Sequence, residues 1–382
     1  MKKIIIIGCL GLLCGTLVQA QNKGKISVSA VPAPQPHYQQ EYTLDAPVNA
    51  AAWNNQPSGM QVSFASGDKL YFRTEVPALE KTTDAWERTA WRGERVNAQV
   101  LVWSSDTVQQ VRVKLNDLVN AQGDVIGKNN ITVNMVRYVV SNFPYGAKDV
   151  TCDVSPYKDS VYLMPDRFES FDRFEVPGKT VRPVWVSINI PDSAKQGVYT
   201  GTIEVQSEKT KSVLQVKLKV QNQVLPKPKD WAHRLDLWQN PIVVARYNDV
   251  KPWSEEHKTL LAKHLKLYAD AGGKYITTYA VHSPWADNSY MIEDAMIDWV
   301  KQKNGSWKFD YNIFDTYVEL AMKAGVDKAI TIYTPLPWGN RFRYLDEASG
   351  NYITEVWNPD TQEYKKFWHV FLDDLKAHLK QK

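Results

Sequence analysis

The segment GVYTGTIEVQSEKTKSVLQVKLKV, residues 197–220, carries the pattern that decides the fold of the first part of the chain. Its second half places an aliphatic side chain at every second position, at Leu214, Val216, Leu218 and Val220. A period of two is typical of a strand with one face in a core. Residues 197–205 form its expected partner strand, with a turn at 208–211, so the segment predicts a hairpin.

The same alternation recurs upstream of this hairpin. We expect further strands at 95–103, 111–115, 131–140 and 182–190. Clusters of Gly, Pro, Asn and Asp separate these segments, and no long helical pattern interrupts them. Many short strands with turn residues between them are typical of a β-sandwich, which we predict over residues 25–225.

The period of the apolar residues changes after a linker at 225–229. Its two prolines, one residue apart, cannot continue the preceding strand and favour an extended connection. Beyond the linker, apolar residues recur at helical spacing in three segments. We expect these helices to begin at Ser254, near Asn312, and at a capping-box pattern formed by Asp360 and Glu363.

Short β-rich segments at 235–237, 274–281 and 328–333 alternate with these helices. The order β-α-β-α-β-α predicts a parallel sheet with right-handed crossovers. A closed barrel has eight such units in about 250 residues. We therefore predict residues 232–382 to be an incomplete (β/α)8 TIM barrel and expect the chain to end before the barrel closes. The predicted fold class is multi-domain, β plus α/β.

The N-terminus predicts export of the protein. Residues 1–20 have the pattern of a signal peptide, in which two lysines precede an apolar run at 4–17 and cleavage is expected before Gln21. The apolar run is shorter than the roughly 20 residues that span a bilayer, so we expect no membrane insertion after signal removal. The sequence IIGC at 6–9 resembles a lipobox, but little apolar sequence precedes it. A soluble protein of the periplasm or cell surface is favoured over a lipoprotein.

Composition argues against several classes of function. Cys152 is the only cysteine outside the predicted signal peptide, so we expect no internal disulfide. Clustered Cys and His residues of a zinc site are absent from the sequence, and we expect no metal and no cofactor. The formal charge of +4 falls by two when the signal peptide is removed. Such a nearly balanced charge indicates no nucleic-acid partner.

Tryptophan and polar residues follow each of the three predicted barrel strands. The sequence has 14 tryptophans, most of which we expect in the cores of the two domains. Function in a barrel gathers at the carboxyl ends of the strands, and indole rings rimmed by polar groups suit a sugar ring. We therefore predict a glycan-binding site formed by Trp238, Asn240, His282, Trp285, Trp338 and Arg341. His282 taken alone fits a structural, hydrogen-bonded histidine equally well.

Asp346 and Glu347 are the adjacent carboxyl pair that a glycosidase could use, because glycoside hydrolysis needs two carboxyl groups. The alternation at 342–345, the turn residues at 348–351 and the β-rich residues 352–354 instead predict a hairpin with this pair at its tip. We favour a surface turn and assign no catalytic residue.

Several motifs resemble one enzyme family, glycoside hydrolase family 123. In the predicted sandwich these are WRGERVNAQ at 91–99 and the less specific segment at 191–201. In the predicted barrel they are PWGNRFRY at 337–344 with DEA at 346–348, and the segment at 367–380. The resemblance covers nearly all of the chain beyond the signal peptide.

The resemblance implies a β-sandwich followed by a (β/α)8 barrel that releases β-linked N-acetylgalactosamine by a substrate-assisted mechanism. In that mechanism the 2-acetamido carbonyl attacks the anomeric carbon, an Asp orients it, and the adjacent Glu is the general acid and base. In the family this pair ends the strand after the helix that here reaches Lys382, so the pair corresponds to no residue of this sequence. We expect a chain that binds N-acetylhexosamine glycans without hydrolysing them. The alternatives are a carbohydrate-binding or surface β-sandwich protein without catalysis, and a structural spacer.

Overall fold

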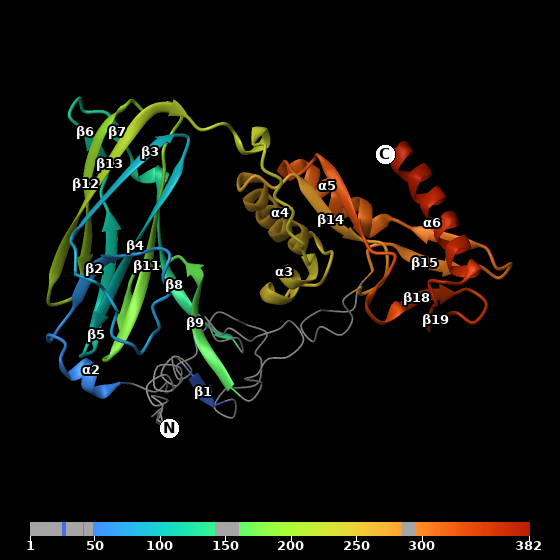
Figure 1. The fold of residues 1–382 in the computed structure, drawn as a ribbon, viewed down its shortest axis with the longest axis horizontal. Helices are drawn as coiled ribbons and strands as arrows, with labels where there is room; N and C mark the ends of the chain where they lie inside the picture. Colours follow the sequence, from blue (N-terminus) through green and yellow to red (C-terminus); the bar gives the residue numbers. More distant parts are fainter. Residues whose placement is uncertain (1–24, 28–40, 42–48, 142–159, 285–294) are drawn as a thin grey trace, which may run out of the picture. The chain divides into compact units, whose positions relative to one another are not determined.

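The computed structural model describes residues 25–27, 41, 49–141, 160–284 and 295–382. The chain divides into two compact units, one reaching Leu225 and the other running from Pro226 to Lys382. Figure 1 shows the strands of the first unit in blue to yellow-green and the elements of the second in yellow to red. The predicted signal peptide and Cys152 lie outside the described residues.

The first unit is a sandwich of two sheets. One sheet has the order β1-β9-β8-β11-β4-β2, and it is formed by β1 (Lys25–Ser27), β2 (Gln61–Ala65), β4 (Arg95–Ser104), β8 (Ile131–Ser141), β9 (Ser160–Glu169) and β11 (Thr180–Asn189). The other has the order β10-β5-β12-β13-β3, and it is formed by β3 (Ala85–Arg92), β5 (Val108–Leu115), β10 (Phe174–Val176), β12 (Gly197–Gln206) and β13 (Lys211–Val224). Two short strands, β6 (Leu118–Asn120) and β7 (Val125–Ile126), extend this second sheet beside β12.

The predicted hairpin at 197–220 is confirmed as β12 and β13, paired antiparallel from Gly197 opposite Val220 to Gln206 opposite Lys211. The alternating aliphatic residues of β13 are buried in the core between the sheets, together with Val100 of β4 and Val184 of β11. The parallel strand β3, which pairs with β13, was not expected. Most of its side chains are exposed, so its sequence lacks the alternation that identifies a strand.

A smaller apolar cluster lies apart from this main core. It consists of Trp53, Tyr71, Leu101, Trp103 and Val181. Trp53 belongs to the short helix α2 (Ala50–Asn54), and its indole N–H donates to Thr74 O at 2.8 Å. Leu101 and Trp103 alternate along β4 with Val100 and Val102 of the main core, so this cluster covers part of the outer face of that sheet.

The second unit contains the predicted parallel pair of strands. β14 (Tyr275–Tyr279) and β17 (Ala329–Tyr333) pair in parallel, and α4 (Glu255–Asp270) and α5 (Asn312–Ala324) accompany them. Ser254 caps α4 as predicted, since its side chain accepts from His257 N. The strand predicted at 235–237 is a single parallel bridge, Leu235 to Gly273. The described residues thus give two parallel strands and one bridge, and the barrel itself stays a prediction.

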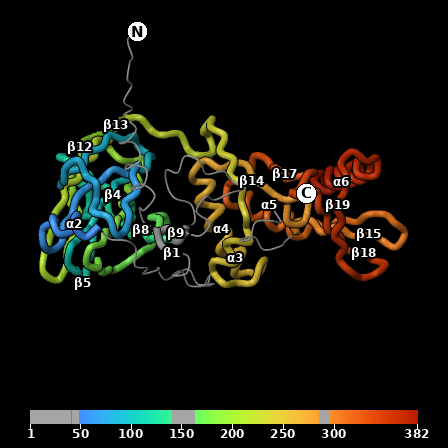
Figure 2. The backbone as a smooth tube through the Cα atoms, turned by 60° about the horizontal axis from the view of Figure 1, so that its bottom comes forward, coloured from blue at the N-terminus to red at the C-terminus, as the bar shows by residue number. Residues whose placement is uncertain are grey.

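A second sheet in this unit was only partly predicted. It has the order β16-β15-β18-β19, formed by β15 (Asp298–Lys301), β16 (Trp307–Asp310), β18 (Arg341–Asp346) and β19 (Asn351–Val356). β18 and β19 are the predicted hairpin, whereas the two shorter strands were missed. Helix α6 (Gln362–Gln381) packs on this sheet, with the Phe371 ring 5.0 Å from Phe309 and 5.6 Å from Trp299. Figures 1 and 2 both show α6 beside β15 and β19.

One expectation for α6 was wrong. Its N-cap is Thr361, whose hydroxyl accepts from Tyr364 N at 3.2 Å, and the predicted capping box of Asp360 and Glu363 does not form. The exposed Asp374 accepts from the Tyr311 hydroxyl at 2.8 Å. This contact ties α6 to the residue that precedes α5.

The connections and remaining helices of the second unit are short. The linker contains one turn of 3-10 helix at Pro228–Asp230, and α3 (Pro241–Asn248) precedes α4. In the part of the chain that the structure describes, no helix has the length and apolar character needed to cross a membrane.

Candidate functional site

The carboxyl ends of β14 and β17 lie side by side. Tyr279 pairs with Tyr333 at the last position of both strands, and Ala280 N donates to Tyr333 O at 2.6 Å. The segments that follow the two strands stay together, because Trp338 N donates to Pro284 O at 3.2 Å. Carboxyl ends of adjacent parallel strands are where barrel and open α/β folds place their ligand sites. The predicted residues of the site are placed by these two segments and by the one that follows Leu235.

Trp238 lies at the end of β17, although the two are far apart in the sequence. Its ring centroid is 5.1 Å from that of Tyr333, and 64% of the side chain's surface is exposed. The neighbouring Gln239 is held on both sides, since its carbonyl accepts from Tyr279 Oη at 3.1 Å and its amide oxygen from Tyr317 Oη at 2.8 Å. The exposed indole is thus carried by a firmly held backbone.

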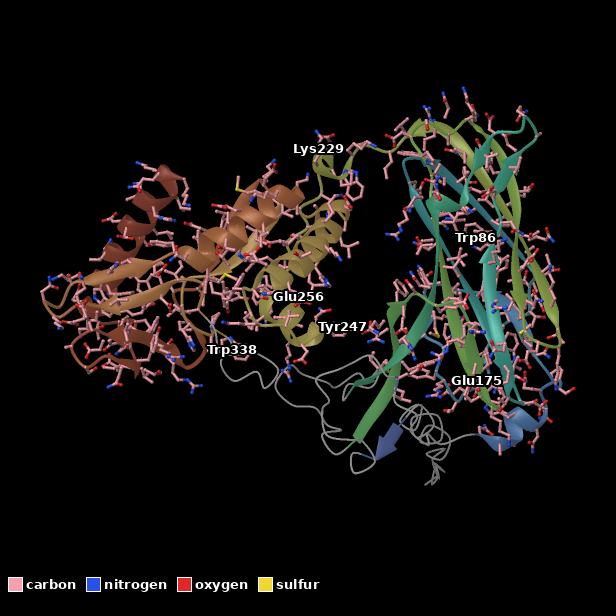
Figure 3. All side chains as sticks on the ribbon, turned by 180° about the vertical axis from the view of Figure 1, so that it is seen from behind. Trp86, Glu175, Lys229, Tyr247, Glu256 and Trp338 are labelled. Carbon is pink, nitrogen blue, oxygen red and sulfur yellow. The ribbon has the colours of Figure 1, made fainter. Side chains whose placement is uncertain are left out.

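Trp338 is the second exposed indole of the site, with 50% of its surface accessible. It begins the short 3-10 turn Trp338–Asn340 that joins β17 to β18, and Figure 3 marks it in the segment after β17. Gly339 adopts φ +71°, where a Cβ would be strained, and the Arg341 guanidinium lies beside it. Arg341 is the exposed first residue of β18. Trp285, also predicted for the site, lies outside the described residues.

Asn240 has a structural role that we did not predict. Its side-chain oxygen accepts from Ile242 N at 3.1 Å and caps α3, where Pro241 occupies the first turn. This bond occupies the oxygen as a helix cap, so a ligand would meet the amide nitrogen. The signal was present in the sequence, because Asn followed by Pro is typical of a helix start.

His282 is held by a residue that we did not predict. Arg343 Nη1 lies 2.7 Å from His282 Nε2, and since a guanidinium only donates, Nε2 accepts and the neutral ring carries its proton on Nδ1. The Arg343 guanidinium also lies 4.4 Å from the centre of the Tyr352 ring. Phe342 and Tyr344 point into the core of this sheet, so Arg343 lies on its opposite face. The alternation of the predicted hairpin is enough to place Arg343 on this face. That Arg343 lies next to His282 is known only from the fold.

Asp298 is a second neighbour of Arg343 that was missed. Burial raises the pKa of its carboxyl group, Asp310 on the paired strand β16 raises it further, and Arg343 acts in the opposite direction. An Asp whose pKa is raised in this way is a candidate for acid-base chemistry. Asp298 starts β15, a strand of four residues too short for its pattern to be recognised.

Asp346 and Glu347 occupy the hairpin tip, as predicted. Asp346 pairs with Asn351 at the end of the β18–β19 ladder, and its carboxylate accepts from Ser349 N at 3.0 Å. The pKa of Asp346 lies below its usual value, and the side-chain hydrogen bond with Ser349 is the largest cause. Glu347 accepts from Lys303 N at 3.0 Å. Both carboxylates stabilise turns, and a depressed pKa does not suit a general acid.

Most of the other tryptophans are structural. Four of them, Trp299, Trp307, Trp357 and Trp368, pack with Phe342, Phe367 and Phe371 between α6 and its sheet. Trp299 is the centre of this cluster, 4.5 Å from Phe367 and 5.9 Å from Phe342. Within the described ranges, no group of three or more His, Cys, Asp or Glu side chains is placed to hold a metal ion.

The chain matches two domain models of one family and resembles a solved enzyme. Residues 64–207 match the glycoside hydrolase 123 N-terminal domain, and residues 238–382 match the glycoside hydrolase 123 catalytic domain, together about three quarters of the chain. A family 123 glycoside hydrolase from Clostridium perfringens, described for glycolipid glycan hydrolysis, superposes with a TM-score of 0.75 at 25% identity. The match covers 85% of this chain and 56% of that enzyme, so this chain spans little more than half of its length.

Other solved structures resemble only part of the chain. The PapD-like domain of human CEP192 has 12% identity and a TM-score of 0.21, and the match covers 40% of this chain and 95% of that one. The CooA pilin subunit from enterotoxigenic Escherichia coli has 12% identity and a TM-score of 0.22, with 43% and 99% covered. At these scores neither carries an argument. No curated protein matches the sequence.

Proposed function

Since the chain belongs to glycoside hydrolase family 123, we propose that it binds glycans ending in β-linked N-acetylgalactosamine at the carboxyl ends of β14 and β17. The observation that supports this site most directly is the pair of exposed indoles there. Trp238 and Trp338 keep 64% and 50% of their surface accessible, while most other tryptophans of the second unit are packed in its core. Exposed, rigidly held indole faces suit the apolar C–H face of a pyranose.

The polar groups at this site supply the directional contacts. Arg343 fixes both the orientation and the tautomer of His282, so the imidazole presents a defined edge to the sugar. The Asn240 amide nitrogen and the exposed Arg341 guanidinium add donors at the rim. A sugar hydroxyl accepts readily from such donors, and the 2-acetamido carbonyl is a still stronger acceptor.

We propose that this chain binds the glycan without hydrolysing it. Family resemblance implies an adjacent Asp-Glu pair, of which the Asp orients the acetamido group and the Glu moves the proton. Among the described residues, the one adjacent Asp-Glu pair is Asp346 with Glu347, and both are engaged in turns of the hairpin. Asp298 has a raised pKa but no adjacent Glu. The (β/α)8 arrangement and export through residues 1–20 belong to the same proposal.

Calorimetric titration with the methyl β-glycoside of N-acetylgalactosamine tests the binding site. We expect Trp238→Ala and Trp338→Ala each to weaken binding about tenfold, because each removes one stacking face. Trp91→Ala is the matched control, since Trp91 is also exposed (41%) but lies in the first unit. Equal affinities of wild type, Trp238→Ala and Trp338→Ala would refute the site. Release of an aryl alcohol from its N-acetyl-β-galactosaminide would refute the absence of hydrolysis.

A further inference from the structure

We propose a second glycan-binding surface in the first unit, on the outer face of the sheet that contains β9 and β11. Its centre is the aromatic pair of Phe168 and Trp185. This surface goes beyond the proposed function, which concerns the strand ends of the second unit, and it shares only the class of ligand with that function. It also gives the sandwich a role of its own.

The two rings form an offset stack that points away from the main core. Their centroids are 5.5 Å apart and their planes differ by 28°. Val184 and Val186, on either side of Trp185 in β11, are fully buried in the core between the sheets. Because side chains alternate along a strand, Trp185 lies on the opposite face. Phe168 keeps 51% of its surface accessible, which a ring that serves only to fill a core would not do.

The pair is held in place from one side by the chain itself. A Cβ on Gly67, in the segment after β2, would lie 3.2 Å from the outer edge of the Trp185 indole. The indole therefore lies close to the Gly67 backbone on one side and contacts the Phe168 ring on the other. An aromatic platform that is fixed before binding loses little conformational entropy when a sugar stacks on it.

Uncharged polar residues flank the pair on the same face. Trp185 pairs with Asn134 of β8 and Gln99 of β4, and cross-strand partners share a face of the sheet. Gln99 is buried and its amide donates to Ser66 O at 2.9 Å, so it supports the aromatic pair and does not face a ligand. Ser187 lies two residues beyond Trp185 in β11 and pairs with Asn97 of β4 and Thr132 of β8. Both partners are exposed.

The Ser187 hydroxyl and the Asn97 amide oxygen are 2.7 Å apart and bonded to each other. The polar row lies about 7 Å along the strand from Trp185, at 3.3–3.4 Å per residue. Ser187 itself is buried, so the exposed Asn97 and Thr132 are the polar groups of this row that a ligand can reach. One sugar ring could stack on the aromatic pair while the next ring hydrogen-bonds to these two side chains. Since carboxylates and amines do not contribute to this row, a neutral glycan fits it better than a charged polymer.

Affinity electrophoresis of the full chain in gels with and without soluble gastric mucin tests this surface. The key comparison uses Trp238→Ala/Trp338→Ala as a background, in which the strand-end site is removed. We expect this double variant to remain retarded, and addition of Phe168→Ala to weaken the remaining binding about tenfold. Phe168→Tyr, which keeps the ring, should restore it. Val213→Ala is the matched control, because Val213 is exposed (41%) on the other sheet.

The outcomes separate this surface from the strand-end site. If the double variant loses all retardation, the second surface is refuted and the proposed function stands. If the double variant migrates as wild type and Phe168→Ala alone abolishes retardation, the second surface stands and the strand-end site is refuted. Absence of wild-type retardation contradicts both. Dimerisation of the wild type that Phe168→Ala abolishes, without an effect on retardation, would make the surface a contact between two copies of the chain.

Discussion

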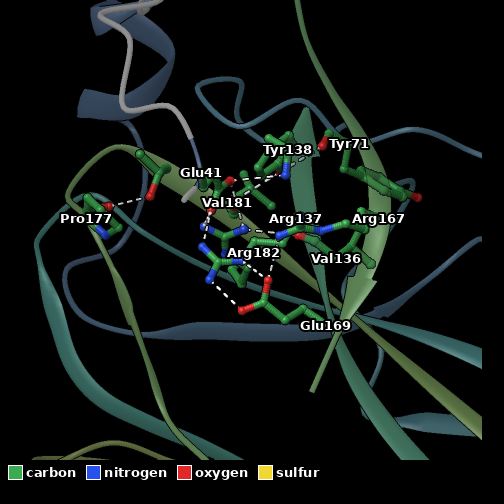
Figure 4. A network of polar contacts seen from close by, with 11 residues as sticks. Glu41, Tyr71, Val136, Arg137, Tyr138, Arg167, Glu169, Pro177, Val181 and Arg182 are labelled. Carbon is green, nitrogen blue, oxygen red and sulfur yellow. Dashed lines mark hydrogen bonds and ion pairs between the residues drawn. The ribbon is translucent and has the colours of Figure 1, made fainter. Parts of the chain in front are cut away.

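Glu41 is expected to stabilise the first unit through its contacts with two arginines, and Glu41→Gln tests how strongly. The carboxylate is 6% exposed and accepts from Arg182 Nη2 at 2.7 Å, Arg182 Nη1 at 3.0 Å, Arg137 Nη1 at 3.2 Å and Tyr138 N at 3.1 Å (Figure 4). Arg137 has a second partner in Glu169, at 2.7 Å. Arg182 is itself 7% exposed, so the loss of negative charge leaves a buried cation without its main counter-ion.

The expected destabilisation follows from these contacts. Breaking a buried ion pair by removing one partner costs about 3–5 kcal/mol. Glutamine keeps one acceptor oxygen, and Arg137 keeps Glu169, so we expect the lower end, about 3 kcal/mol. For a domain of about 200 residues, 1 kcal/mol shifts the melting temperature by roughly 2–4 °C. The first unit of the Glu41→Gln variant should therefore have a melting temperature about 6–12 °C below that of the wild type.

Differential scanning calorimetry measures this shift, with Glu87→Gln as the control. Glu87 pairs with Lys217 in the same unit at 3.1 Å, but both side chains are half-exposed, and such pairs are worth about 0–1 kcal/mol. A Glu41→Gln melting temperature within about 2 °C of that of Glu87→Gln would refute the reasoning.

The contacts of the Glu41 carboxylate also predict that its contribution to stability depends on pH. Burial alone raises the pKa of Glu41, but the charge and hydrogen bonds of Arg182, with Arg73 and Tyr138 N–H, hold it below its usual value of 4.5. A carboxyl group with a depressed folded pKa stabilises the protein above its unfolded pKa and loses that contribution as pH falls. The difference between wild type and Glu41→Gln should thus be full above about pH 4.5 and shrink in more acidic solution.

Three further predictions concern the second unit. Gly273→Ala should destabilise it by more than about 2 kcal/mol in urea unfolding, because the new Cβ would lie 2.4 Å from the Tyr268 ring. Asn240→Ala should cost about 1 kcal/mol in the same assay, since α3 loses its cap. Burial lowers the pKa of His257, whose Nε2 donates to Pro241 O, so the stability of the unit should fall as pH drops below about 6.5 and His257→Gln should reduce that dependence.

Matched variants separate these effects from general disturbance. Gly127→Ala should be nearly neutral, because its Cβ would meet only Asp117 Oδ1 at 3.8 Å. Asn240→Ser should restore most of the stability lost in Asn240→Ala, since Ser also caps helices. His264→Gln, on the exposed side of α4, is the matched control for the loss of a histidine. A Gly273→Ala protein as stable as wild type, or an unchanged pH profile of His257→Gln, would contradict the packing described here.

Local sequence signals predicted the elements whose pattern is continuous and half-buried. The alternation in β13 and the Ser254 cap of α4 are local signals, and the structure confirms both. Strands without such a signal were missed, since β3 is mostly exposed and β15 has four residues. Local pattern also misled at α6, where Thr361 supplied the cap in place of Asp360.

Contacts between distant segments could not be predicted from the sequence. Trp238 and Trp338 were predicted for the site because they follow strands, and the first proves to lie on Tyr333. The bond between Arg343 and His282 joins residues 61 positions apart. The raised pKa of Asp298 is due first to burial and then to Asp310 on the paired strand, and no local pattern encodes either. Sequence pattern therefore identifies which residues end a strand, while their partners depend on the register of the fold.

The most direct test of glycan binding at the strand ends is fluorine NMR of the chain labelled with 5-fluorotryptophan. Trp238→Phe and Trp338→Phe assign the two resonances among the 14 tryptophans of the sequence. Addition of the methyl β-glycoside of N-acetylgalactosamine should shift both resonances, with one common saturation curve, and leave those of the core residues Trp299 and Trp368 in place. Saturable shifts confined to other tryptophans, or no shift at all, would contradict the proposed site.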